Sequence, residues 1–162
     1  PRLASQSGVA LGRIGAGVRG GPSVSLGRWL LSGELGLEWF PERTVRRDAT
    51  SMRLAEASPR LAARAQLAVG ELRLGGSAGL LACAVEASTT VEGREHATSR
   101  WLAAGFAGAS AELPVAGQLS LAAELELQIF QRRAKFGVNQ RAVADLGRAR
   151  GLFGITLIWR SR

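Results

Sequence analysis

Two carboxylates, Glu124 and Glu126, stand two residues apart in the stretch 118–131. Side chains at this spacing share one face of a β-strand, so the pair could act as a general acid and base. The chain also has 21 basic residues, and all except Lys135 are arginines. Arginine forks bind carboxylates well. We therefore interpret the two glutamates as salt-bridge partners.

The remaining reactive residue types form no recognised catalytic or metal-binding spacing. Cys83 is the only cysteine, which excludes a disulfide framework and a thiolate metal site. There is no glycine-rich phosphate loop, no zinc spacing and no nucleophile elbow. We expect no metal and no cofactor.

The stretch 118–131 is the clearest structural element. Leu119, Leu121, Leu125, Leu127 and Ile129 all occupy odd-numbered positions, and the even-numbered positions between them carry the polar residues. A period of two predicts a β-strand. The clean apolar parity lasts about eleven residues, and a transmembrane strand needs about 9–11.

The same period predicts further strands and an all-β, antiparallel up-and-down transmembrane β-barrel. We expect seven strands, at about 8–19, 24–40, 50–69, 74–91, 101–113, 118–131 and 147–160. Short turns at 20–23, 69–72 and 114–117 alternate with long loops at 41–48, 92–99 and 132–145, the last as an extended hairpin around Asn139. This alternation is typical of outer-membrane barrels. Residues 50–69 could instead form an amphipathic helix, but Pro59 argues for a strand with a bulge.

The four tryptophans test this interpretation. Trp29, Trp39, Trp101 and Trp159 all lie on the predicted outward parity. Trp29 and Trp39 would be about 25 Å apart along the membrane normal, which matches the apolar band of such barrels. We expect an aromatic girdle with Trp29 and Trp159 at the short-turn rim and Trp39 and Trp101 at the long-loop rim. The alternative to a girdle is that the four tryptophans belong to a buried core and occupy these positions by chance.

The opposite parity predicts a charged interior. Its members are Arg13, Arg19, Arg28, Glu34, Glu38, Arg60, Arg64, Glu86, Glu112, Glu124, Glu126, Arg148 and Arg150. An eight-stranded barrel is just wide enough for side chains to fill, so we expect a salt-bridged plug. A selective pore or small-ligand cavity is the alternative. On the outer face we expect Leu35, Leu37, Leu125, Leu127, Ile155 and Leu157.

Length and composition agree with one folded domain over residues 1–162. Hydrophobic residues make up 46% of the chain, and no apolar run reaches the roughly 18 residues of a membrane helix. The net charge is +8. Because the arginines are dispersed and are not clustered with aromatics, we do not expect nucleic-acid binding.

The chain resembles small eight-stranded outer-membrane β-barrel proteins of Gram-negative bacteria, especially a poorly characterised group from GC-rich genomes. Residues 27–35, 79–86 and 111–121 and the closing strand carry the resemblance. It implies a bacterial outer-membrane location, with membrane lipid, lipopolysaccharide and the assembly machinery as partners. The family has eight strands and we expect seven here, so the eighth either lies upstream of Pro1 or is an unrecognised strand within residues 1–162. If it is absent from these residues, a strand upstream of Pro1 or a partner chain should close the barrel. Members of the family usually end in an aromatic residue. In this chain Trp159 is followed by Arg160, Ser161 and Arg162, so the aromatic residue is displaced from the end.

These patterns predict an outer-membrane barrel with a structural or surface-interaction role exerted through its long loops. Arg43, Arg46 and Arg47 could contact lipopolysaccharide phosphates, although a solvated loop explains them too. A water-soluble barrel that binds an apolar ligand is an alternative. An outer-membrane lipid-modifying enzyme is another, because His96 near Thr98 and Ser99, with Glu92 or Glu95, is similar to the pairing in outer-membrane esterases. We expect no enzymatic activity.

Overall fold

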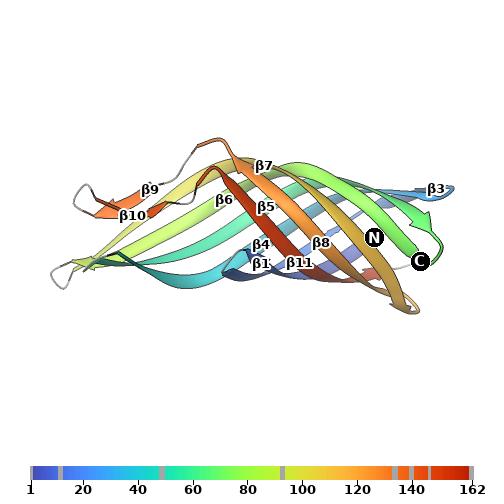
Figure 1. Ribbon diagram of the computed structural model, residues 1–162, viewed down its shortest axis with the longest axis horizontal. Coiled ribbons are helices and arrows are strands. Elements are labelled where there is room, and N and C mark those ends of the chain that lie inside the picture. Colours follow the sequence, from blue (N-terminus) through green and yellow to red (C-terminus); the bar gives the residue numbers. More distant parts are fainter. Residues whose placement is uncertain are drawn as a thin grey trace.

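The computed structural model describes residues 2–10, 13–47, 50–91, 94–132, 135–138, 141–145 and 147–160. These residues form antiparallel β-strands joined by short connections (Figure 1). The strands are β1 (Arg2–Ala10), β2 (Arg13–Gly21), β3 (Ser23–Leu26), β4 (Trp29–Arg47), β5 (Thr50–Val69), β6 (Leu72–Val91), β7 (Arg94–Ala116), β8 (Leu119–Phe130), β9 (Lys135–Val138), β10 (Arg141–Asp145) and β11 (Ala149–Arg160). The described residues include no helix that is long and apolar enough to cross a membrane.

The main sheet closes on itself. Its order is β2-β1-β11-β8-β7-β6-β5-β4-β3, and an additional pairing joins β2 to β4. Because β2 and β3 pair with β4 in one continuous register, together they make one strand of the barrel wall, interrupted at Pro22. We call each such position in the wall a stave. The described strands therefore make a closed antiparallel barrel of eight staves, which confirms the predicted fold class.

The register sets the tilt of the barrel. From Trp29 the paired residues run once around the ring and return to β4 at Trp39, through Leu67, Leu74, Ala111, Ala123, Ile155, Ser7 and Ala16. The ladder thus shifts by ten residues per circuit. With a rise of about 3.3 Å per residue and strands about 4.8 Å apart, eight staves tilt by about 40° from the barrel axis.

The expectation of a missing first strand is wrong. Residues 2–10 form β1, which pairs with β11 from Arg2 opposite Arg160 to Ala10 opposite Leu152. The expected strand 8–19 is instead parts of two strands, β1 and β2, that pair with each other. The sequence pattern did not predict β1 because residues 2–7 are mostly polar and show no alternation of apolar and polar residues. β1 begins and β11 ends at the same rim, where the two chain ends lie in Figure 1.

The turn expected at 20–23 is also absent. Gly20 and Gly21 continue β2, and the turn falls at Gly27, whose φ is 61°. A glycine pair before proline usually indicates a turn. Here Gly21 permits close approach instead, because a Cβ at that position would lie 1.8 Å from the carbonyl oxygen of Gly33 on β4.

Residues 50–69 form β5, so the strand interpretation is confirmed and the helix excluded. The expected bulge at Pro59 is absent, since Pro59 pairs in register with Leu37. The register shift lies between Phe40 and Arg43, around Pro41. Most of the loops expected at 41–48 and 92–99 are strand, and residues 132–145 contain the β9–β10 hairpin. Asn139 itself lies outside the described residues.

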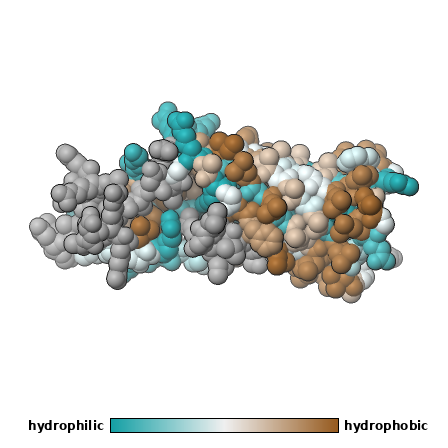
Figure 2. Space-filling view, in the orientation of Figure 1, coloured by the Kyte–Doolittle hydropathy of each residue, from teal (hydrophilic) through white to brown (hydrophobic). Residues whose placement is uncertain are grey.

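Alternate side chains along each long strand face opposite sides of the barrel wall. Leu35, Leu37, Leu125, Leu127, Ile155 and Leu157 are all exposed on the outside, as predicted. In the space-filling view, hydrophobic residues gather over the half of the molecule that holds the short turns (Figure 2). The outer surface of that half is therefore apolar, which is unlike a water-soluble domain.

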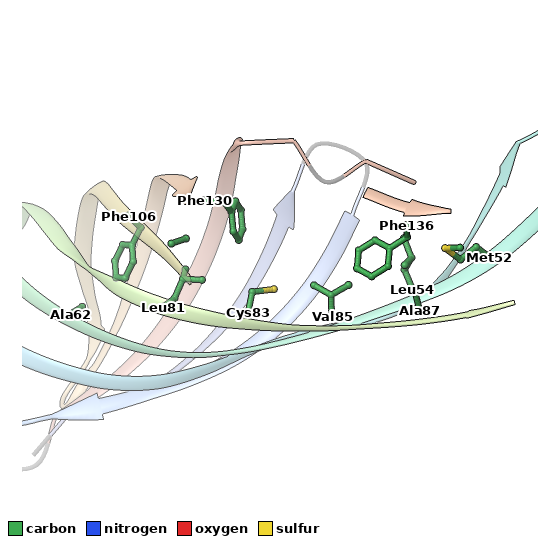
Figure 3. Close-up of a cluster of buried hydrophobic side chains, with 11 residues drawn as sticks. Met52, Leu54, Ala62, Leu81, Cys83, Val85, Ala87, Phe106, Phe130 and Phe136 are labelled. Atoms are coloured by element: carbon green, nitrogen blue, oxygen red, sulfur yellow. The ribbon is translucent and has the colours of Figure 1, made fainter. Parts of the chain in front are cut away.

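The interior holds charged side chains and a buried apolar cluster that overlap in the middle of the barrel. The cluster is formed by Met52, Leu54, Ala62, Leu81, Cys83, Val85, Ala87, Ala104, Phe106, Phe130 and Phe136 (Figure 3). Leu81 pairs with Arg60 and Val85 with Glu56, so only its end towards the long hairpins lies beyond the charged residues. Phe136 comes from β9, so this hairpin packs onto the open end of the barrel.

Candidate functional site: the charged barrel interior

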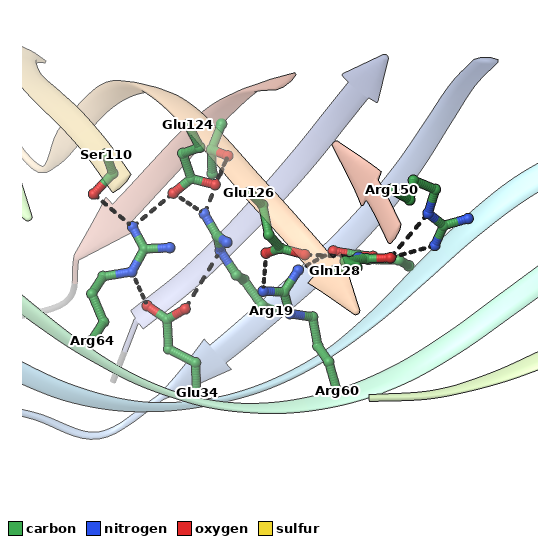
Figure 4. Close-up of polar contacts among 11 residues, drawn as sticks. Arg19, Glu34, Arg60, Arg64, Ser110, Glu124, Glu126, Gln128 and Arg150 are labelled. Carbon is green, nitrogen blue, oxygen red and sulfur yellow. Dashed lines mark hydrogen bonds and ion pairs between the residues drawn. The ribbon is translucent and has the colours of Figure 1, made fainter. Parts of the chain in front are cut away.

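Inward-facing positions on five of the eight staves supply the charged network around the centre of the barrel. Arginines come from β2, β5 and β11, and glutamates come from β4, β5 and β8. The strand period of two places them all on the lumen side. The network arranges itself in layers along the barrel axis (Figure 4).

The central layer is a closed ring of two arginines and two glutamates. Arg64 lies 3.1 Å from Glu34 and 2.7 Å from Glu124. Arg19 also pairs with both carboxylates, at 3.6 Å from Glu34 and in direct contact with Glu124. Thr156 donates a further hydrogen bond to Glu124 at 3.1 Å. All four charged side chains are buried, so their mutual attraction is screened little by water.

The second layer centres on Arg60. Its guanidinium pairs with Glu38 and with Glu126, and its carbon Cζ lies 4.0 Å from the centroid of the Phe106 ring. Gln128 donates to Glu126 at 2.7 Å and to Glu38 at 3.3 Å. One arginine thus bridges two carboxylates from opposite sides of the lumen, and the amide of Gln128 joins the same pair.

The third layer borders the apolar cluster. Arg150 donates to Glu56 at 2.7 Å and to Gln128 at 3.0 Å. Its guanidinium also lies 4.9 Å from the centroid of Phe40 and 5.3 Å from that of Phe130. A guanidinium over an aromatic face is a favourable contact between a cation and an apolar surface. The third layer, like the second, therefore packs charged groups directly against aromatic rings.

A fourth layer lies near the short turns, around Glu112. This carboxylate pairs with Arg160 and with Arg73 at 3.5 Å, and it accepts a hydrogen bond from Gln66 at 3.0 Å. With this layer, the network joins six arginines to six glutamates: Arg19, Arg60, Arg64, Arg73, Arg150 and Arg160, with Glu34, Glu38, Glu56, Glu112, Glu124 and Glu126.

Most residues predicted for the interior lie in this network. Glu34, Glu38, Arg64 and Glu124 are buried, and Glu126 and Arg150 are partly buried. The side chain of Arg13 lies outside the described residues. Trp29, Trp39, Trp101 and Trp159 are all exposed on the outside, with Trp39 and Trp101 joined through Ala57 and Ala84 on one row of the ladder.

Three of the predicted interior positions are wrong. Glu86 is exposed, because the odd positions of β6, from Leu81 to Ala87, are the ones that face the lumen. The sequence misled here because apolar residues line the inside of β6, so polarity no longer marks the inner face. Arg148 is exposed because it precedes β11, which begins at Ala149. Arg28 is also exposed, in the turn before β4.

Sequence reasoning missed five members of the network: Glu56, Gln66, Arg73, Gln128 and Arg160. A signal existed for four of them, because they share the even numbering of Arg60 and Arg64, of Glu124 and Glu126, or of Arg150. Arg73 lies on β6, where polarity does not mark the inner face. Glu56 was overlooked since residues 50–58 show no clear apolar alternation.

The loop residues considered for chemistry lie on extended strands. Arg43 is partly buried on β4, and the side chains of Arg46 and Arg47 lie outside the described residues. His96 and Ser99 are both exposed on β7, three positions apart, which places them on opposite faces of the strand. Within the described part of the chain, no group of three His, Cys, Asp or Glu side chains could hold a metal ion.

Structural comparison finds similar folds among outer-membrane barrels. A major outer membrane protein from Thermus thermophilus has a TM-score of 0.71 and 10% identity, covering 99% of both chains. Neisserial surface protein A has a TM-score of 0.50 and 8% identity, covering 99% of this chain and 94% of the other. Ail, the attachment invasion locus protein of Yersinia pestis, has a TM-score of 0.50 and 12% identity with the same coverage.

These identities establish a shared fold and nothing more. No protein-family model matches the sequence. A search of curated proteins also gave no match. The chain therefore has the fold of small eight-stranded outer-membrane barrels, with a buried salt-bridge network inside.

Proposed function

We propose that this protein is a bacterial outer-membrane β-barrel whose interior is plugged and whose role is structural or surface-interacting. One observation carries the proposal: a closed barrel is apolar outside and holds paired charges inside. This is the reverse of a water-soluble ligand-binding barrel. A closed barrel also leaves no unpaired sheet edge in lipid. The fold shared with the three outer-membrane proteins supports the same location.

The exposed tryptophans support a membrane position. Trp29 and Trp159 lie near the short turns, and Trp39 and Trp101 lie on one row towards the long hairpins. With strands tilted by about 40°, the ten residues between Trp29 and Trp39 span about 25 Å along the normal. We assign the two levels to the two membrane interfaces.

The long hairpins carry the surface role in this proposal. β4, β5, β6 and β7 have 19 to 23 residues, about twice the length needed to cross the bilayer. Their far halves therefore project beyond it. Arg43, Arg46 and Arg47 lie in this region, where contact with lipopolysaccharide phosphates suits guanidinium chemistry.

Depth-dependent quenching tests the membrane position. The protein is reconstituted into vesicles whose lipids carry bromine at a defined carbon, and single-tryptophan variants are compared. We expect headgroup-proximal bromines to quench Trp29 and Trp39 more than bromines at the bilayer centre do. A tryptophan introduced at Leu125 should show the opposite order. A protein that stays monomeric and folded without detergent or lipid would contradict the proposal.

The surface role needs its own assay. Binding to vesicles that contain lipopolysaccharide is compared for the wild type and for a variant with Arg43, Arg46 and Arg47 replaced by glutamine. We expect weaker, less salt-sensitive binding in the variant. Equal binding would remove these arginines from the proposal and leave the membrane position untouched.

A further inference from the structure

The outer wall of the barrel carries a broad hollow on the side formed by β4, β5 and β6. Its volume is about 830 Å³, and its lining includes the small outward residues Gly33, Ala63, Ala65, Gly76 and Ala78. A Cβ added at Gly33 would meet nothing within 4 Å, and one at Gly76 would meet the carbonyl oxygen of Gly108 at 3.6 Å. This part of the wall is therefore open. An unfilled hollow loses dispersion contacts, so lipid hydrocarbon should fill it.

The outer face of β7 leads from this hollow towards the long hairpins. The hollow reaches β7 at Gly108, and the next outward residues in that direction are Ala107, Gly105 and Ala103. In the ladder, Gly105 stands between Leu80 of β6 and Ile129 of β8, and both of these side chains are more than half exposed. A lane one strand wide thus runs along β7 between larger side chains. From Gly108 to Ala103 it is about 16 Å long, roughly one leaflet of a hydrocarbon core of about 30 Å.

A second, smaller hollow lies at the end of this lane towards the long hairpins. Its volume is about 320 Å³, and it is lined by Ala82, Trp101, Leu102, Ala103, Gln131 and Arg132. Ala82 and Ala103 are paired in the ladder and form the small-residue floor. The backbone N–H of Gln131 donates to the carbonyl oxygen of Ala103 at 3.0 Å, which holds Gln131 beside that floor. The smaller hollow therefore joins an indole, an amide and a guanidinium.

These three polar groups suit a phosphate. Arg132 is exposed, and a guanidinium can bind two phosphate oxygens with parallel hydrogen bonds. The side-chain amide of Gln131 supplies a further donor. Trp101 is 68% exposed, and tryptophan is enriched at the level of lipid headgroups, where its ring is apolar and its N–H is polar. The smaller hollow can thus hold a phosphate head while the lane holds hydrocarbon.

The charge beside the smaller hollow favours an anion. The backbone N–H of Phe130 donates to the carbonyl oxygen of Arg148 at 2.8 Å, so the exposed Arg148 lies next to the strand end that carries Arg132. On the outer face of β6, Glu86 is exposed four residues beyond Ala82, about 13 Å along the strand. Two guanidiniums therefore lie nearer to the head position than this carboxylate does.

We propose that the two hollows and the lane on β7 hold one lipid with a phosphate head, the chemistry that lipopolysaccharide presents at its base. The phosphate lies between Arg132 and Gln131, and Trp101 packs beside the head. One acyl chain runs over Gly105 into the larger hollow. This inference rests on the proposed membrane position, and its site is separate from the arginines of β4.

Native mass spectrometry of the delipidated protein in detergent measures the role of the phosphate. The probes are lipid A and its dephosphorylated form, which has the same acyl chains. We expect the protein to retain one lipid A, and Arg132→Gln to lower that retention several-fold without affecting the dephosphorylated form. Arg53→Gln, at an exposed arginine of β5 outside both hollows, is the matched control. Equal retention of the two probes by the wild type, or displacement of lipid A by inorganic phosphate alone, would overturn the proposal.

Blocking the lane tests the path of the acyl chain. A Cβ at Gly105 would lie 3.9 Å from the carbonyl oxygen of Gly79, an ordinary contact, so Gly105→Leu can fill the lane without moving the backbone. We expect this variant to retain several-fold less lipid A while its thermal unfolding is unchanged. Ala123→Leu adds the same side chain to the outer face of β8 and should retain as much lipid A as the wild type. Undiminished retention in Gly105→Leu would contradict the assigned path.

Photocrosslinking separates failure of this site from failure of the membrane position. The protein in nanodiscs is irradiated with lipid A that carries a diazirine in one acyl chain, and adducts are mapped by peptide mass spectrometry. We expect adducts concentrated on β6 and β7 around Gly105. Adducts spread evenly over the outer wall, Leu125 and Ile155 included, would refute the site and leave the membrane position intact. A lack of adducts on every outward residue would refute both.

Discussion

Neutralising one carboxylate of the central ring should destabilise the barrel strongly. Glu124 accepts from two guanidiniums, those of Arg19 and Arg64, and from the hydroxyl of Thr156. In Glu124→Gln the amide keeps the volume and removes the charge. Two buried guanidiniums then share the single carboxylate of Glu34.

The expected cost follows from burial. Removing one member of a buried ion pair typically costs about 3–5 kcal/mol, because the partner charge stays buried without compensation. Glu124 has two such partners, but the glutamine oxygen can still accept a hydrogen bond. We therefore expect a loss of about 3–5 kcal/mol in the free energy of unfolding.

An exposed ion pair provides the matched control. Glu42 lies 3.7 Å from Arg53, and both side chains are more than half exposed. Glu42→Gln makes the same chemical change and should cost at most about 1 kcal/mol. Urea unfolding in lipid vesicles, followed by tryptophan fluorescence, measures both, with unchanged denaturant slopes as the condition for comparison. Equal losses in the two variants would refute the argument from burial.

Three further predictions follow from the wall and the plug. Leu125→Arg should cost about 2–4 kcal/mol in vesicles, because it places a charge on the outer face near the bilayer midplane; a negligible loss would argue against lipid contact there. Gly21→Ala should cost about 1–3 kcal/mol by overpacking, whereas Gly33→Ala, with nothing within 4 Å of its added Cβ, should be tolerated; thermal unfolding of both variants compares them. The wild-type protein should give no ion-conducting steps in planar bilayers, because Arg60 bridges the lumen between Glu38 and Glu126; regular single-channel steps would contradict a plugged lumen.

The alternation of polar and apolar residues predicted most strands of the barrel, because polar side chains mark the inner face and apolar side chains the outer face. On β4 and β8 every inner glutamate alternates with an outer apolar residue, as Glu34 does with Leu35 and Glu124 does with Leu125. Where both faces are apolar, the signal vanishes. Leu80 and Leu81 are adjacent on β6, yet the first is exposed and the second is buried.

The sequence could not show which charged side chains pair with each other inside the barrel, and the reason is a different one. Parity shows that Arg60 faces inward, but its partners come from β4 and β8, on either side of the lumen. That pairing depends on the shift of ten residues around the ring, and the shift depends on every hairpin register together. A turn placed wrongly at 20–23 and an unrecognised strand β1 each change the predicted register around the ring. They therefore change which residues are predicted to meet across the lumen.

The network also determines where the net charge lies. Its six arginines and six glutamates cancel, so the whole formal charge of +8 belongs to side chains outside it. Among the described residues at the end that holds the long hairpins, Arg53, Arg100, Arg132, Lys135 and Arg148 are exposed, together with the carboxylates Glu42, Glu86 and Glu95. Charges in that exposed position are screened by salt over about 8–10 Å. Any attraction of this end to anionic surfaces should therefore weaken as ionic strength rises, while the buried network keeps the barrel folded.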